Sequence, residues 1–158
     1  MKVTYDPLTP TPHQLLLADR LEEVLRTRVR YQRLLEPNRG NGPSIDFRIH
    51  TRRAGLSVAL VLYQDSFHIS AGGASARIEL ISTDEYEKWA DNVVNVTFHL
   101  LRNPIRIRVR KPVLRWLPTE SAMYLSNGVT SGWNGNILAF RGAAETVFED
   151  WCESVESG

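Results

Sequence analysis

Short runs of strictly alternating apolar and polar residues are the feature that most constrains the fold of this chain. Residues 45–49 (IDFRI) and 105–109 (IRIRV) are the clearest examples. Side chains on a strand point alternately to opposite faces, so these runs predict strands with one buried face. Turn residues follow the runs at short intervals, which indicates hairpin connections and an antiparallel sheet.

Two further stretches extend the predicted sheet in the first half of the chain. Leu56–Tyr63 is apolar at nearly every position, which predicts a central strand that is covered on both faces. Residues 67–70 predict a third strand, which Gly72 and Gly73 interrupt. The alternation resumes over residues 77–80, so this part is either one bulged strand or two short strands.

A second group of short strands is predicted in the C-terminal half. Residues 122–126 form one, and residues 129–133 lie between two Asn-Gly hairpin signals. A last strand is predicted over residues 137–141. The segment 113–117 lies between two prolines, so any strand there is short or at a sheet edge.

Three segments have the three- and four-residue spacing of a helix. Thr11 and Pro12 form a start signal for a helix from Pro12 to Leu35. Residues 83–101 follow a capping-box pattern that begins at Ser82; residues 94–100 also alternate, but the capping box favours a helix. A final helix is predicted from Gly142, on the spacing of its apolar residues.

The predicted order is helix, three or four strands, helix, three or four strands, helix (α-βββ-α-βββ-α). Helices gathered on one face of a mostly antiparallel sheet make a two-layer α+β sandwich. The 158 residues suit a single domain over 1–158, in which residues 1–11 form an extended lead-in. This order is similar to that of small bacterial chaperone-like and immunity-like binding domains, a likeness of fold that carries little functional weight.

Cysteine content and hydropathy bound the cellular setting. Cys152 is the single cysteine, which excludes an internal disulfide and a multi-cysteine zinc site. The first residues lack the apolar core of a signal peptide. The longest apolar run, Val58–Tyr63, is far shorter than the roughly 20 residues that span a bilayer. We therefore expect a cytoplasmic protein that does not enter a membrane.

The near-zero net charge hides a polarised chain. Lys and Arg number 19 against 18 Asp and Glu. However, every charged residue in 102–115 is basic, and every charged residue in 142–158 is acidic. Arg106, Arg108 and Arg110 share one face of a strand at intervals of about 7 Å, close to the spacing of phosphates on a nucleic-acid strand. The other interpretation, which we prefer because no aromatic residues interleave with these arginines, is pairing with acids on neighbouring strands, such as Asp46 or Glu79.

The acidic end of the chain has two interpretations of its own. It could lie over the basic face of the same chain or of a second copy. It could also be a solvated helix face, which is the interpretation we prefer.

Histidines and carboxylates suggest a second candidate site. Asp46, Arg48 and His50 point to one face of a strand, and His68 is expected on a neighbouring strand. Asp46 and His50 are about 13 Å apart along the strand, too far for a direct hydrogen bond. The spacing also matches no standard zinc motif. We therefore predict no catalytic residue, no metal ligand and no cofactor.

The glycine-rich stretch 126–136 contains Trp133 between two turns, where it could be a binding anchor or a plug of the core. Together these features predict a small non-enzymatic module that binds another protein, or its own second copy, through an open charged sheet face. The alternatives are nucleic-acid or other polyanion binding through the arginine strand, and an enzyme that uses His50 or His68. The predicted binding residues are Arg48, His50, His68, Arg106, Arg108, Arg110 and Trp133.

Overall fold

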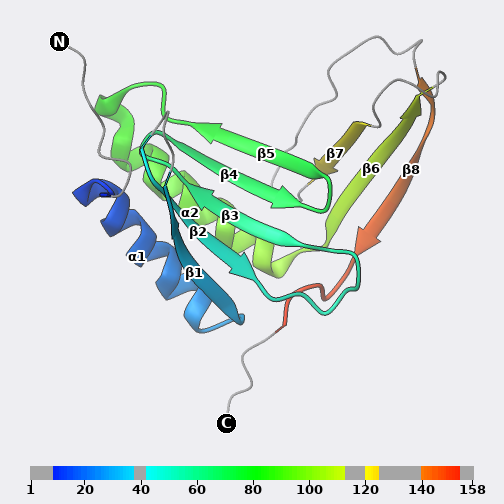
Figure 1. Ribbon diagram of the computed structural model, residues 1–158, viewed down its shortest axis with the longest axis horizontal. Helices are drawn as coiled ribbons and strands as arrows, with labels where there is room; N and C mark the ends of the chain where they lie inside the picture. Colours follow the sequence, from blue (N-terminus) through cyan, green and yellow to red (C-terminus); the bar gives the residue numbers. More distant parts are fainter. Residues whose placement is uncertain (1–8, 38–41, 113–119, 125–139, 154–158) are drawn as a thin grey trace.

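The computed structural model describes residues 9–37, 42–112, 120–124 and 140–153. A five-stranded antiparallel sheet carries two helices on one face, and a three-stranded sheet lies beside it (Figure 1). The α+β class and the two-layer arrangement are therefore confirmed. Among the described residues, no helix is long and apolar enough to span a bilayer. Trp133 and the strand predicted over 129–133 lie outside these ranges.

The large sheet has the order β1-β2-β3-β4-β5, and the small sheet has the order β7-β6-β8. The helical elements are α1 (Pro12–Arg26), the 3₁₀ turn η1 (Thr83–Glu85) and α2 (Tyr86–Arg102). The strands are β1 (Tyr31–Glu36), β2 (Ser44–Ile49), β3 (Val58–Leu62), β4 (Ser66–Ala71), β5 (Ala74–Glu79), β6 (Ile105–Pro112), β7 (Glu120–Tyr124) and β8 (Phe140–Phe148).

Helix α1 begins where the sequence predicts and ends earlier. The Thr11 hydroxyl accepts a hydrogen bond from the Gln14 N–H at 3.1 Å, and Pro12 takes the first helical position. The prediction that this helix reaches Leu35 is wrong, because residues 31–36 pair with β2 as strand β1. The β-branched residues Thr27 and Val29 weaken the helix beyond Arg26, and the edge of β2 offers the backbone new partners.

The second helix is confirmed, including the segment 93–101 that also alternates. It begins slightly later than predicted: the Ser82 hydroxyl accepts from the Asp84 N–H at 3.4 Å, a 3₁₀ turn follows, and α2 starts at Tyr86. Val93, Val96 and Leu100 bury one stripe of α2 against the sheet.

The helix predicted from Gly142 is wrong. Residues 140–148 form β8, which pairs along nearly the whole of β6. Val147 and Trp151 do have helical spacing, but Val147 lies on a strand and Trp151 follows it. Long-range pairing with the strongly alternating β6 overrides this weak local pattern.

Gly72 and Gly73 separate two strands, which decides between the alternatives for residues 67–80. Strands β4 and β5 form a tight hairpin in full register, from Ala71 opposite Ala74 to Ser66 opposite Glu79. Gly72 has a positive φ of 59°, and a β-carbon there would lie 3.1 Å from the Ile107 side chain. The small sheet therefore packs closely against this hairpin.

The core lies between the large sheet and the two helices. The inward positions of β2, β3 and β4 are at most 5% exposed, as the alternating patterns predict. Leu17, Leu21 and Leu25 of α1 pack into the same core. Ile105, Ile107 and Met123 of the small sheet extend it.

The end of the chain returns to the large sheet. After β8, Asp150 takes a positive φ of 44° and Trp151 becomes buried. The Arg52 N–H donates to the Trp151 carbonyl at 2.8 Å, and the Glu153 N–H donates to the His50 carbonyl at 2.9 Å. The Arg30 N–H donates to the Glu153 carbonyl at 3.0 Å. These bonds tie residues 151–153 to both β1 and β2.

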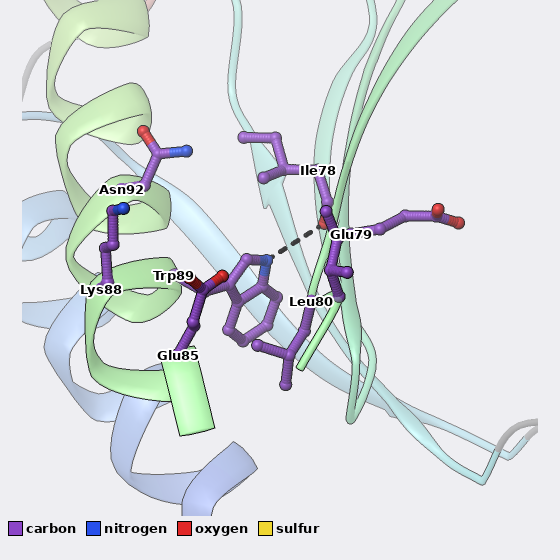
Figure 2. Close-up of a pocket in the computed structure, with 8 residues that line it drawn as sticks. Ile78, Glu79, Leu80, Glu85, Lys88, Trp89 and Asn92 are labelled. Atoms are coloured by element: carbon purple, nitrogen blue, oxygen red, sulfur yellow. Dashed lines mark hydrogen bonds between the residues drawn. The ribbon is translucent and has the colours of Figure 1, made fainter. Parts of the chain in front are cut away.

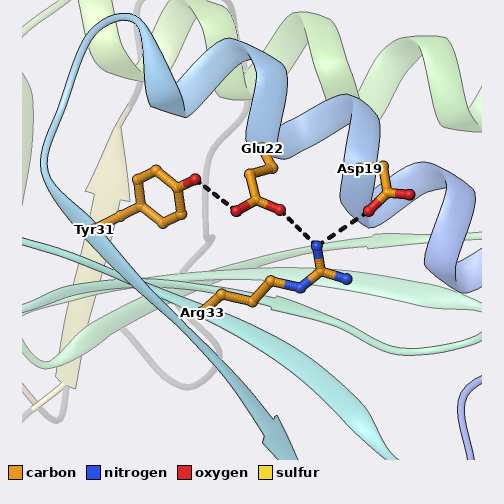
Figure 3. A network of polar contacts seen from close by, with 4 residues as sticks. All are labelled: Asp19, Glu22, Tyr31 and Arg33. Carbon is orange, nitrogen blue, oxygen red and sulfur yellow. Dashed lines mark hydrogen bonds and ion pairs between the residues drawn. The ribbon is translucent and has the colours of Figure 1, made fainter.

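A polar network joins α1 to the inner side of β1 (Figure 3). The Tyr31 hydroxyl donates to Glu22 Oε1 at 2.7 Å, and Arg33 Nη1 donates to Glu22 Oε2 at 2.6 Å and to Asp19 Oδ1 at 3.1 Å. Strand β1 is at the sheet edge, so polar side chains replace the apolar ones that face the helices further in.

Replacing Glu22 with glutamine should reduce the dependence of stability on acid pH. The Tyr31 hydroxyl, with Arg33, holds the pKa of Glu22 below its ordinary value, so its ionised form stabilises the fold. That contribution is fully present above the unfolded-state pKa of about 4.3 and is lost as pH falls from there through the lower pKa of the folded state. Thermal unfolding across this range should show a smaller decrease for Glu22→Gln than for the wild type.

Glu23→Gln, on the exposed side of the same helix, controls for the loss of a carboxylate. Parallel pH profiles for Glu22→Gln and the wild type would contradict the assignment of the network.

Candidate functional site

The face of the large sheet that lies opposite α1 and α2, here called the outer sheet face, carries two of the predicted binding residues. Register places Arg48 on β2 and His68 on β4, with β3 between them. Arg48 is exposed and its Nη2 lies 3.7 Å from Glu36 Oε1 on β1. The outer sheet face comprises Gln32, Leu34, Asp46, Arg48, Ala59, Val61, His68, Ser70, Ser75 and Arg77.

Strand β3 is central, as predicted, but it is not covered on both faces. Its inward residues Leu60 and Leu62 are 0% exposed, whereas Ala59 and Val61 between them are only half-buried. The apolar run misled the prediction because the two faces of a central strand need not be equally covered. The middle of the outer sheet face is therefore apolar and reaches solvent.

Charged and polar groups surround this apolar centre in one cross-strand row. Leu34, Asp46, Val61, His68 and Arg77 lie directly opposite one another across five strands. The order places Val61 between an acid on one side and two basic side chains on the other. The row therefore has an acidic residue on β2 and basic residues on β4 and β5.

Partial burial favours the neutral forms of the two titratable groups that flank Val61. Burial lowers the pKa of His68, and the nearby Arg77 lowers it further. Its Nε2 is buried and has no hydrogen-bond partner among the described residues, and the ring of Tyr63 lies 5.0 Å from its own. Burial also raises the pKa of Asp46, although the Ser44 hydroxyl donates to its Oδ1 at 2.7 Å.

The geometry does not bring the predicted histidines and carboxylate together. Asp46 and His68 are two strands apart, or about 10 Å between backbones. His50 lies beyond the end of β2, where its backbone bonds to Arg30 and Glu153. The described part of the chain contains no group of three or more His, Cys, Asp or Glu that could hold a metal ion.

The arginine row lies on the other sheet and has acids beside it. Arg106 and Arg108 are exposed on β6, and Arg108 forms an ion pair with Glu145 of β8. Arg110 lies opposite Glu120 of β7 in register. This arrangement agrees with the preferred interpretation, in which the row pairs with neighbouring strands, although the acids differ from the Asp46 and Glu79 first considered.

The pairing of Arg108 with Glu145 also connects the two charged segments of the chain. The Arg108 side chain, with a contribution from Arg106, lowers the pKa of Glu145. Glu145 is thus held as a carboxylate beside the basic row. At this position the acidic end of the chain lies against the basic strand of the same chain, as one of the two interpretations supposed.

A hollow beside strand β5 was not predicted from the sequence (Figure 2). It has a volume of about 300 Å³ and lies between the C-terminal half of β5 and the start of α2. The indole Nε1 of Trp89 donates to the Ile78 carbonyl at 3.3 Å at its floor. Its lining residues are Ile78, Glu79, Leu80, Ile81, Glu85, Lys88, Trp89 and Asn92.

Ile81, at the rim of this hollow, is 92% exposed. Its place next to the apolar Leu80, directly before the helix start signal at Ser82, was the available sequence signal.

Comparisons with protein-family models, curated proteins and solved structures found no match to this chain. Its function is therefore argued from its own geometry alone.

Proposed function

We propose that this protein is a non-enzymatic protein-binding domain and that its partner docks on the outer sheet face. The observation that carries the proposal is the solvent access of Ala59 and Val61, which lie between the buried inward residues of the central strand β3. A binding surface typically has an apolar centre and a polar rim. Here Arg48, His68 and Arg77 supply the rim.

The arrangement of charge on this face favours a protein partner. Arginine is enriched at protein interfaces, and the half-buried His68 and Asp46 lose little hydration when a partner covers them. The partner is another protein or a second copy of this chain. Neither a metal ion nor a cofactor is part of the proposal.

Polyanion binding through Arg106, Arg108 and Arg110 has less support. Glu145 neutralises Arg108, and Glu120 stands opposite Arg110 in register. An enzyme that uses His50 or His68 also has less support, because Asp46 lies about 13 Å from His50 and about 10 Å from His68.

Affinity capture with a variant of Val61 tests the proposal. Val61→Arg places a charge at the apolar centre of the outer sheet face, and its stem can extend to solvent without unfolding the strand. A hot-spot residue near the centre of an interface contributes about 2 kcal/mol or more, so we expect capture of the partner to fall by at least about tenfold. The bait is the tagged chain in a nuclease-treated native lysate, with quantitative mass spectrometry as the readout.

Leu16→Arg is the matched control, because Leu16 is an exposed apolar residue on α1, away from the sheet face. A partner captured by the wild type and by Leu16→Arg but lost with Val61→Arg would support the proposal. Equal capture by all three baits, or capture that disappears with nuclease treatment, would refute it and favour another surface or a nucleic acid.

A further inference from the structure

We propose that two copies of this chain associate edge to edge through the C-terminal half of β5, with Arg77 of each copy opposite Glu79 of the other. The partner is a second copy, and the interface lies along the β5 edge, where Arg77 is the one residue that it shares with the outer sheet face. The result would be one sheet continuous through both copies, with the helices of both on the same side.

Strand β5 is an edge of the large sheet (Figure 1). The Leu80 N–H donates to the Asp65 carbonyl at 2.8 Å, which sets the hydrogen-bonding phase of the β4–β5 pair. Since bonding residues alternate along an antiparallel strand, Ile78 also bonds towards β4. Arg77 and Glu79 therefore direct their backbone N–H and C=O groups away from the sheet, where another strand can pair with them.

Strand β7 limits how much of this edge is available. It lies near the Ala74 end of β5, beside the hairpin (Figure 1). The C-terminal end of β5, which carries Arg77 and Glu79, lies away from β7 (Figure 1). The pairing is therefore short, and we expect a weak dimer whose formation depends strongly on its side-chain pairs.

Charge selects a single register for a symmetric pair of β5 strands. Arg77 and Glu79 lie on the same face of the strand, form an ion pair with each other, and each side chain is 58% exposed. A two-fold axis at Ile78 places Arg77 opposite Glu79 twice. The two neighbouring registers with the same hydrogen-bonding phase would instead place Arg77 opposite Arg77, or Glu79 opposite Glu79, which is unfavourable.

This register also covers the hollow beside β5. Ile78 and Leu80 point towards α2, while Glu79 points away from it (Figure 2). With the axis at Ile78, the two Ile78 residues form a pair without backbone hydrogen bonds, in which side chains approach most closely. The second Ile78 then lies over the hollow that Leu80 and Trp89 line.

The ion pair within one chain does not oppose this exchange. An exposed pair of this kind contributes only about 0–1 kcal/mol, so replacing its partner with one across the interface costs little. Charged residues on an edge strand usually prevent aggregation with other strands. Here the same two charges discourage foreign strands and match a second copy of β5.

Sedimentation velocity over a wide range of concentrations tests the proposal. The wild type should show a monomer–dimer equilibrium. Arg77→Glu and Glu79→Arg should each be monomeric, because each variant places two pairs of like charges across the interface. Arg48→Glu, a charge reversal on the outer sheet face away from the edge, should dimerise like the wild type.

A mixture of the two monomeric variants gives the decisive measurement. Arg77→Glu mixed with Glu79→Arg should form a heterodimer, because opposite charges then face each other at both positions. A wild type that stays monomeric to its solubility limit would overturn the proposal. So would single variants that dimerise, or a mixture that stays monomeric while the wild type dimerises. Val61→Arg, the variant that tests partner binding on the outer sheet face, should still dimerise. Either proposal can therefore fail without the other.

Discussion

Replacing Trp151 with alanine should lower the free energy of unfolding by about 3–5 kcal/mol, the usual cost of removing a large buried aromatic side chain. Trp151 is 1% exposed and is among the largest fully buried side chains. Its Nε1 donates to the Asn103 carbonyl at 3.1 Å, at the point where α2 ends and the small sheet begins. The substitution therefore opens a cavity at the junction of the two sheets.

Trp151→Phe is the control that separates packing from hydrogen bonding. It keeps most of the apolar volume but leaves the Asn103 carbonyl without this donor, so we expect a loss of about 1–2 kcal/mol. Urea unfolding of the wild type and both variants gives the differences in the free energy of unfolding. The slopes of that free energy against urea concentration are compared as well. A loss below about 1 kcal/mol for Trp151→Ala would mean that the tryptophan only rests on the surface of the core.

Replacing Gln14 with leucine should cost about 2–4 kcal/mol, because it removes two buried hydrogen bonds to backbone carbonyl groups. Gln14 is 2% exposed, and its Nε2 donates to the Pro43 carbonyl at 2.7 Å and to the Leu62 carbonyl at 2.9 Å. One amide thus joins the first turn of α1 to the start of β2 and the end of β3. Leucine matches its size but cannot make either bond.

Thr11→Ala distinguishes this role from helix capping. Gln14 also takes part in the capping box, in which its Oε1 accepts from the Thr11 N–H at 3.4 Å. Loss of the Thr11 cap should cost about 1 kcal/mol. If Gln14→Leu costs no more than Thr11→Ala by chemical denaturation, the two carbonyl bonds contribute nothing to stability.

Most of the fold was predictable because alternation and start signals agree with the long-range pairing. The strands over 45–49 and 105–110 and the helix over 86–101 are of this kind. The prediction failed where a segment satisfies two periods at once. Tyr31 and Leu35 fit a helical stripe as well as a strand, and only the pairing with β2 decides between them.

The candidate surfaces were predictable only in part. Alternation correctly placed Arg106 and Arg108 on one sheet face, whereas His68, expected on a strand next to that of Arg48, lies two strands away from it. It could not give the partners across strands, because register depends on contacts between distant segments. The hollow at Trp89 combines residues from β5 and α2 and has no compact sequence pattern.

The closure of residues 151–153 onto Arg30 and His50 has a consequence for the order of events during synthesis. Both helices and the five strands of the large sheet can form as soon as residue 102 leaves the ribosome, but the ends of β1 and β2 then lack their backbone partners at residues 151–153. These bonds wait until residue 153 is made, and contacts so distant in sequence slow folding. A nascent chain stalled before Trp151 should therefore remain more sensitive to protease at the ends of β1 and β2 than the released protein.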